Sequence, residues 1–172
     1  MGKKLRIGWF TFTCCEDSSI MFVELLNRYY FKWSEQLDFR YAKMLKSKNV
    51  LDELDVAFVE GAISNEREKE KLLEIRSKAK YLVAIGSCAC NGTPSAQRNS
   101  FSEAQMESIR PTLKQWDLYE KVLKLEEVVK VDDKVDGCPM FENIFLSTLD
   151  KYLKMFGISE PPPHADDKTG RR

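Results

Sequence analysis

The amino-acid sequence predicts a single α/β domain built on a doubly wound parallel sheet. Short apolar runs alternate with longer amphipathic runs along most of the chain, which is the pattern of strands alternating with helices. The apolar runs are continuous rather than alternating, as expected for parallel strands covered on both faces. At 172 residues the chain suits one hydrophobic core, and the order of the runs favours a flavodoxin-like sheet.

The N-terminal part of the chain predicts a strand, a helix and a second strand. The first strand is expected at Leu5–Phe10, and the helix is expected to begin near Ser18, with Asp17 or Ser18 as its cap. Apolar residues recur in this helix at three- and four-residue intervals, so one side faces the core. Its aromatic residues belong to that side: Tyr29, Tyr30 and Trp33. A short second strand is expected at Phe39–Ala42.

Two further strands are predicted by the runs Leu54–Gly61 and Tyr81–Cys88, which are apolar throughout. The segment between them is rich in charged residues and predicts a helix, with Ser64 as its expected cap. Strands and helices in this alternating order imply an α/β doubly wound sheet.

The remaining elements are predicted from weaker patterns. After a loop-like segment, helices are expected at Ser102–Ile109 and at Leu113–Leu123. The valine-rich run Glu126–Val131 predicts a late strand. A final helix is expected over Pro139–Met155, because proline suits the first turn of a helix.

Composition restricts the function of the chain. Basic and acidic residues balance at 27 each, so no strong field favours nucleic acid or an anionic membrane. No segment approaches the roughly 20 apolar residues that span a bilayer, and the first residues lack the pattern of a secretory signal. We therefore expect a cytoplasmic protein that reaches a membrane only through partner subunits. Residues 1–157 are expected to form the domain and residues 158–172 a disordered tail.

The five cysteines indicate a metal site. Cys14 and Cys15 follow the first predicted strand, Cys88 follows a later one, and Cys138 follows the predicted late strand. Because the carboxyl ends of parallel strands meet at one edge of a sheet, these four thiols are expected at one place. Four thiolates bind an iron–sulfur cluster or a structural zinc ion, and adjacent thiols also suit a redox switch. Cys90 is expected to be a loop or core thiol.

The neighbours of these cysteines suit such a site. Adjacent side chains on a regular strand point to opposite faces, so Cys14 and Cys15 share a site only if the strand has already become a turn. Glu16 and Glu60 lie at the same expected edge. Either carboxylate could couple proton uptake to a change of charge at the site; equally, Glu60 could make a structural hydrogen bond and Glu16 face solvent or a partner.

Four segments, taken together, resemble a known family: "TCCED", "VEGAI", "AIGSCACNGTP" and "GCPM". Their order and spacing are similar to those of the small, electron-transfer subunit of [NiFe] hydrogenases and of the 20 kDa iron–sulfur subunit of respiratory complex I. The resemblance implies a flavodoxin-like fold that holds one [4Fe–4S] cluster beside the active centre of a partner large subunit. In a hydrogenase that centre is the [NiFe] site, so this chain would relay electrons and perform no nickel chemistry.

The resemblance also implies the ligands. Cys88 and Cys138 match family ligands directly, whereas the first motif departs from the hydrogenase pattern Cys-x-x-Cys, because Ser18 stands where the second cysteine is expected. The adjacent Cys14 and Cys15 resemble the complex I arrangement, in which both thiols bind the cluster. A Ser18 oxygen ligand is the alternative. No cysteine follows Cys138, so we expect one cluster, with further iron–sulfur or flavin subunits completing the electron path.

Three functions stay open at this point. The first is a hydrogenase small subunit, favoured by the short N-terminus and the soluble composition. The second is a 20 kDa-type subunit of a complex I-like, quinone-linked oxidoreductase, favoured by the adjacent cysteines. The third is a zinc-binding or thiol-switch interaction protein. For the first two, a large subunit must shield the cluster, and Trp9, Phe12 and Met140 are the expected contact residues.

Overall fold

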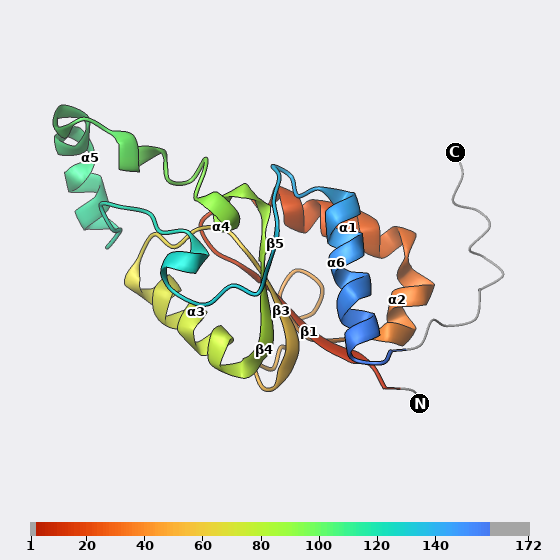
Figure 1. The fold of residues 1–172 in the computed structure, drawn as a ribbon. Coiled ribbons are helices and arrows are strands. Elements are labelled where there is room, and N and C mark those ends of the chain that lie inside the picture. The colour runs from red at the N-terminus through yellow and green to blue at the C-terminus, as the bar shows by residue number, and fades with distance from the viewer. Residues whose placement is uncertain (1–2, 159–172) are drawn as a thin grey trace.

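The computed structural model describes residues 3–158, and its centre is a five-stranded parallel sheet with strand order β2-β1-β3-β4-β5. The strands are β1 (Leu5–Thr11), β2 (Leu37–Ala42), β3 (Leu54–Glu60), β4 (Ala79–Ile85) and β5 (Asp133–Val135). This order, with helices on both faces (Figure 1), confirms the predicted flavodoxin-like, doubly wound sheet.

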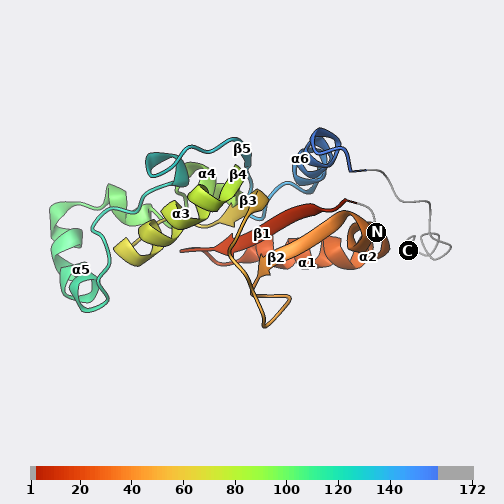
Figure 2. The same ribbon diagram turned by 90° about the horizontal axis from the view of Figure 1, so that it is seen from below.

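More helices cover one face of the sheet than the other (Figure 1). The helices are α1 (Asp17–Arg28), α2 (Tyr30–Gln36), α3 (Glu66–Lys78), α4 (Gly86–Asn91), α5 (Glu103–Gln115) and α6 (Glu142–Met155), with 3₁₀ helices η1 (Gln97–Ser100) and η2 (Leu125–Glu127). Figure 1 shows α1, α2 and α6 on one side of the sheet and α3 on the other. In both views α5 lies away from the sheet, at the opposite end of the molecule from α2 (Figure 2).

The face under α1, α2 and α6 carries an aromatic core. Trp9 of β1 stacks on Phe22 of α1 with ring centroids 4.2 Å apart, and Phe145 of α6 meets both rings edge-on. Phe58 is paired with Trp9 across the sheet and packs in the same cluster. Because alternate strand residues point to opposite faces, this side of each strand supplies large apolar groups that hold the three helices in place.

The opposite face is covered by α3 and by the segment around η2. Leu72 and Ile75 of α3 pack with Phe10 of β1 and with the other apolar side chains of this face. Helix α3 begins at an Asn65 cap, whose side chain accepts a hydrogen bond from the Glu68 backbone N–H at 2.9 Å. The expected Ser64 cap is therefore wrong by one residue.

The long first helix that the sequence predicts is two helices. The chain leaves the helical conformation at Tyr29, and α2 begins at Tyr30. This break changes the direction in which the aromatic residues point. Trp33 is buried as expected, whereas Tyr30, expected in the core, is 57% exposed.

The predicted late strand, Glu126–Val131, is wrong. Leu125–Glu127 forms η2 instead, and the Val129 backbone N–H donates to the Leu125 carbonyl at 3.0 Å. Leu125 and Val129 are both buried in the same part of the core. Their four-residue spacing brings both side chains to one side of a helical turn. The strand that completes the sheet is β5, at Asp133–Val135.

Two other predicted boundaries also shift. The expected helix Leu113–Leu123 is wrong, because α5 ends at Gln115 and Asp117 takes a left-handed conformation with φ of 50°. The last helix begins at Glu142 rather than at Pro139. Of the predicted tail, only Ile158 lies among the described residues, where it is buried. No helix within residues 3–158 is both long and apolar enough to cross a membrane.

Candidate metal centre

The carboxyl edge of the sheet brings four cysteines to one cavity. At this edge Glu60 of β3 is paired with Thr11 of β1 and with Ile85 of β4, and Ile85 is paired with Val135 of β5. Thr11, Ile85 and Val135 therefore lie at the same level of the sheet. Three residues beyond these positions come Cys14, Cys88 and Cys138, respectively. With Cys15 they line one small cavity of about 10 Å³. The sequence prediction that these four thiols meet is therefore consistent with the structure.

A turn after β1 places Cys14 and Cys15 on the same cavity. The Thr13 backbone pairs with Ala62 in both directions, at 3.1 and 3.0 Å, which carries the chain past the end of β1. Glu16 then takes a left-handed conformation with φ of 62° and leads into α1. Because the strand geometry ends before the cysteines, the two neighbouring side chains are not forced to opposite faces.

Glycine and hydrogen bonds join the Cys88 and Cys138 segments. Gly86 opens α4 with φ of 77°, a conformation that larger residues rarely adopt, and a Cβ there would lie only 2.9 Å from Ser18 Oγ. The Ser87 backbone N–H donates to the Gly137 carbonyl at 2.8 Å, and Ser87 Oγ donates to Asp136 at 2.7 Å. These bonds hold the two cysteine-bearing segments together.

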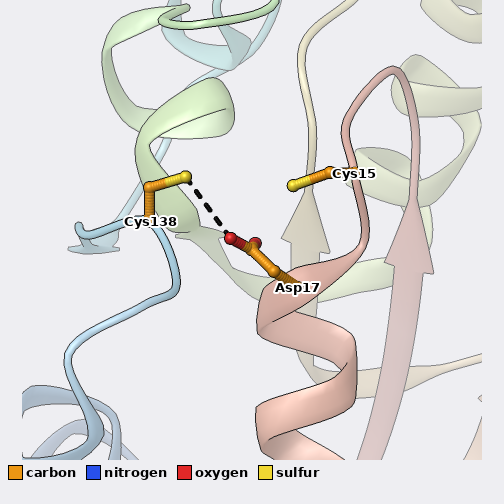
Figure 3. A group of neighbouring side chains, drawn as sticks. All are labelled: Cys15, Asp17 and Cys138. Carbon is orange, nitrogen blue, oxygen red and sulfur yellow. Dashed lines mark hydrogen bonds between the residues drawn. The ribbon is translucent and has the colours of Figure 1, made fainter.

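Asp17 lies between two of the thiols, and the sequence reasoning missed it. The Cys138 thiol donates to Asp17 Oδ2 at 3.3 Å (Figure 3). One ligand atom each of Cys15, Asp17 and Cys138 lies within 4.8 Å of the others. The hydrogen bond from the thiol raises the pKa of Cys138 to about 11. The sequence signal for this role is its place in "CCED", two residues after Cys15.

The cavity is not neutralised by basic side chains. Its lining, within the described residues, includes no Lys, Arg or His. Burial, together with the smaller effect of the nearby Glu60 carboxylate, raises the pKa of Cys14 to about 12. A cationic group would therefore favour the thiolate forms and release protons on binding. Four soft sulfur donors around one cavity without competing cations suit an iron–sulfur cluster or a thiophilic metal.

Glu60 caps α1 from the neighbouring strand. Its carboxylate accepts from the backbone N–H groups of Ser18 and Ser19, both at 3.1 Å, and from Ser19 Oγ at 2.6 Å. Burial raises the pKa of Glu60, and these hydrogen bonds offset part of the rise. The expected capping by Asp17 or Ser18 is wrong, because Glu16 holds the cap position without a side-chain hydrogen bond and Glu60 supplies the acceptor.

The other candidate residues divide between the cavity and its surroundings. Ser18 lines the cavity and is fully buried, and its Oγ accepts from the Met140 backbone N–H at 3.2 Å. Glu16 is exposed and does not line the cavity. Cys90 is a core thiol, as expected, with its sulfur 3.6 Å from the Ala84 carbonyl.

The expected contact surface is mostly wrong. Trp9 and Met140 are 2% and 1% exposed, since both side chains pack in the aromatic core. Exposed apolar side chains occur at other positions that are close to the cysteines in sequence. Ile20 of α1 is 63% exposed, and Phe141, three residues after Cys138, is 55% exposed. Trp9 is buried because alternate residues of β1 point to opposite faces of the sheet, and Met140 is buried by the fold of the loop between β5 and α6.

The fold and the cavity define a flavodoxin-like domain with four cysteine thiols at the carboxyl edge of its sheet. The family model described as "NADH ubiquinone oxidoreductase, 20 Kd subunit" matches residues 14–152. The chain belongs to this family.

Several relatives are components of hydrogenases. The chain is 27% identical over 177 residues to a subunit of the F420-non-reducing hydrogenase of Methanothermobacter marburgensis, covering 94% of this chain and 57% of that protein. It is 24% identical over 165 residues to NAD-reducing hydrogenase HoxS subunit delta of Cupriavidus necator, covering 86% and 78%. The chain thus spans about half the length of the Methanothermobacter relatives, 57% and 50% in two species.

The fold is also similar to one chain of a known hydrogenase structure. A chain in the crystal structure of an NAD⁺-reducing [NiFe]-hydrogenase in the H₂-reduced state superposes with a TM-score of 0.75 and 26% sequence identity. The match covers 94% of this chain and 97% of that chain.

Proposed function

We propose that this chain is the electron-transfer subunit of a [NiFe] hydrogenase. It holds one proximal [4Fe–4S] cluster on Cys14, Cys15, Cys88 and Cys138, beside the nickel–iron centre of a partner large subunit. The observation that carries the proposal is the meeting of these four thiols at one cavity. When bound, the cluster accepts and returns one electron at a time.

The likeness to components of hydrogenases supports the assignment. The matched hydrogenase chain is covered almost end to end, and the relatives described above belong to hydrogenases. The donor set suits the cluster, because all four groups are sulfur and no basic side chain among the described residues lines the cavity. Further iron–sulfur or flavin subunits would continue the electron path, and the cytoplasmic location and the domain limits stay predictions.

The two sides of the cavity have different tasks in this proposal. Cys14 and Cys88 form its inner side, since Cys88 is buried and Cys14 is half-buried. Cys15 and Cys138 are exposed, so a partner must cover them to keep water from the cluster. The exposed Ile20 and Phe141 are the apolar residues from which we expect that contact to be built.

Of the two carboxylates, Glu60 is better placed to respond to cluster charge. It lines the cavity and has no basic partner there, whereas Glu16 does not line the cavity. An added electron at the thiol site would favour the protonated form of a buried carboxyl group, because like charges disfavour its ionised form.

The alternative is a 20 kDa-type subunit of a complex I-like, quinone-linked oxidoreductase. The family description and the adjacent cysteines at one cavity favour it. A zinc or thiol-switch protein is the third candidate, supported by the group Cys15, Asp17 and Cys138, whose ligand atoms lie close together.

Metal analysis of the native complex separates these functions. The full chain would be tagged in its native host and the complex purified under anaerobic conditions. About four irons and four sulfides per chain, with nickel in a co-purifying large subunit, are expected. Iron and sulfide without nickel would select the quinone-linked alternative. Zinc, or the absence of metal, would contradict both electron-transfer functions.

A further inference from the structure

Ser95 reaches two parts of the thiol site from the segment that follows α4. Its Oγ lies 3.2 Å from Cys88 Sγ and 3.0 Å from the Thr13 carbonyl oxygen. The first contact is to a buried cysteine and the second is to the turn that precedes Cys14. One side chain therefore touches both of the sequence-distant segments that form the inner side of the cavity.

The hydroxyl can serve only one of these acceptors at a time, because it carries a single hydrogen. A thiol sulfur is a weak acceptor, so in the metal-free chain the Thr13 carbonyl is the better one. A metal-bound thiolate carries negative charge, and hydrogen bonds to charged acceptors are the stronger ones. The Thr13 carbonyl also accepts from the Ala62 backbone N–H at 3.0 Å, so it keeps a partner when the hydroxyl turns to sulfur.

The position of Ser95 is set by the same element that carries Cys88. Helix α4 ends at Asn91 and is followed by the cap residue Gly92, which has φ of 92°; the Ala96 backbone N–H donates to the Gly92 carbonyl at 2.7 Å. The Gln97 backbone N–H donates to the Pro94 carbonyl at 3.1 Å. These bonds form a short turn around Ser95, so its hydroxyl stays near the sulfur without depending on a long flexible side chain.

We propose that Ser95 is a positioning residue that donates its hydrogen bond to the Cys88 sulfur and thereby raises the reduction potential of the bound cluster. The inference rests on the proposed function. Hydrogen bonds to ligand sulfur tune the potential of iron–sulfur clusters. A donor stabilises the more negative, reduced state more than the oxidised state, so its loss makes reduction harder.

The test is a redox titration of the purified complex, followed by electron paramagnetic resonance of the reduced cluster. Ser95→Ala is expected to keep its iron and shift the midpoint potential to a lower value. Ser95→Thr keeps a hydroxyl and is expected to recover most of the wild-type potential. The matched control is Thr93→Ala, which removes an exposed hydroxyl in the same segment and is expected to leave the potential unchanged.

Several results would overturn the inference. It fails if Ser95→Ala titrates like the wild type, or if Ser95→Thr shifts as far as Ser95→Ala. It also fails if Ser95→Ala loses its iron, since Ser95 would then hold the site together rather than set its potential. A wild-type complex that contains no cluster contradicts the proposed function itself, so the two failures are distinguishable.

Discussion

Two carboxylates at opposite ends of β3 are buried in contrasting surroundings. Asp55, near the amino end, is 3% exposed, and Glu60, at the carboxyl end, is 2% exposed. Asp55 accepts from the Arg6 guanidinium at 3.0 and 3.2 Å and from Lys80 at 2.9 Å. Glu60 accepts from the backbone N–H groups of Ser18 and Ser19 and from the Ser19 hydroxyl.

The pKa values of these carboxyl groups move in opposite directions. Burial by itself raises the pKa of Asp55, but hydrogen bonds from Arg6 and Lys80 outweigh it and hold that pKa at about 2. Burial raises the pKa of Glu60, and no basic side chain within residues 3–158 is among the groups that lower it. At the amino end of the sheet, the buried carboxylate of Asp55 is thus neutralised by basic side chains of the chain itself. The carboxyl end keeps uncompensated negative groups beside four thiols, which suits a site completed by a metal cation.

The largest expected effect lies at the carboxyl end. Cys88→Ala should lower the affinity of this chain for iron by about tenfold or more, because losing contacts outside the ligand set already costs 10–100-fold in metal affinity. Iron per chain, measured by elemental analysis, checks this. Cys90→Ala is the matched control, since that thiol lies in the core outside the cavity. Equal iron loss in both variants would contradict the ligand assignment.

The next effect concerns stability at the amino end. Asp55→Asn should lower the free energy of unfolding of the full chain by about 2 kcal/mol, because it removes the buried charge that accepts hydrogen bonds from Arg6 and Lys80. Urea unfolding at pH 7 measures it. Glu53→Gln is the control, because Glu53 also pairs with Arg6 but its side chain is 82% exposed; about 0.5 kcal/mol or less is expected. Similar losses in both would remove the distinction.

Acid should reveal the same ion pairs by a different route. The pKa of Asp55 is about 2 in the folded chain, below its ordinary value of 3.8, so its charged form stabilises the fold above about pH 4. That contribution, roughly 2 kcal/mol, should be lost as the pH falls from about 4 to about 2. The free energy of unfolding of Asp55→Asn, measured over the same pH range, should fall less steeply with acid than that of the wild type. An equal slope in both proteins would show that groups other than Asp55 cause the loss of stability in acid.

The smallest effect is expected for Glu60→Gln. The amide loses one acceptor for the N–H groups of α1, which costs stability, but it also removes a buried charge that no cation neutralises. We expect these terms to offset each other, leaving the free energy of unfolding of the metal-free full chain within about 1 kcal/mol of the wild type. A loss as large as that of Asp55→Asn would show that the two ends of β3 do not differ in this way.

Much of the architecture was predictable because it depends on local patterns. The continuous apolar runs at Leu54–Gly61 and Tyr81–Cys88 indicated buried parallel strands, and β3 and β4 lie there. The rule that strand ends share an edge then brought Cys14 and Cys138 together from opposite ends of the sequence. The late strand failed because a valine-rich run suits a strand by propensity, whereas its contacts with the core follow helical spacing.

The sequence by itself determined the first four strands, the helix between β3 and β4, and the edge at which the thiols meet. Only the tertiary structure decided which side chains accompany them. Asp17 and Cys138 are 121 residues apart, and Ser95 meets Cys88 through the turn after α4. Periodicity reports whether a residue is buried, but a contact between loops depends on backbone turns, such as the left-handed Glu16, whose direction the spacing of apolar residues does not encode.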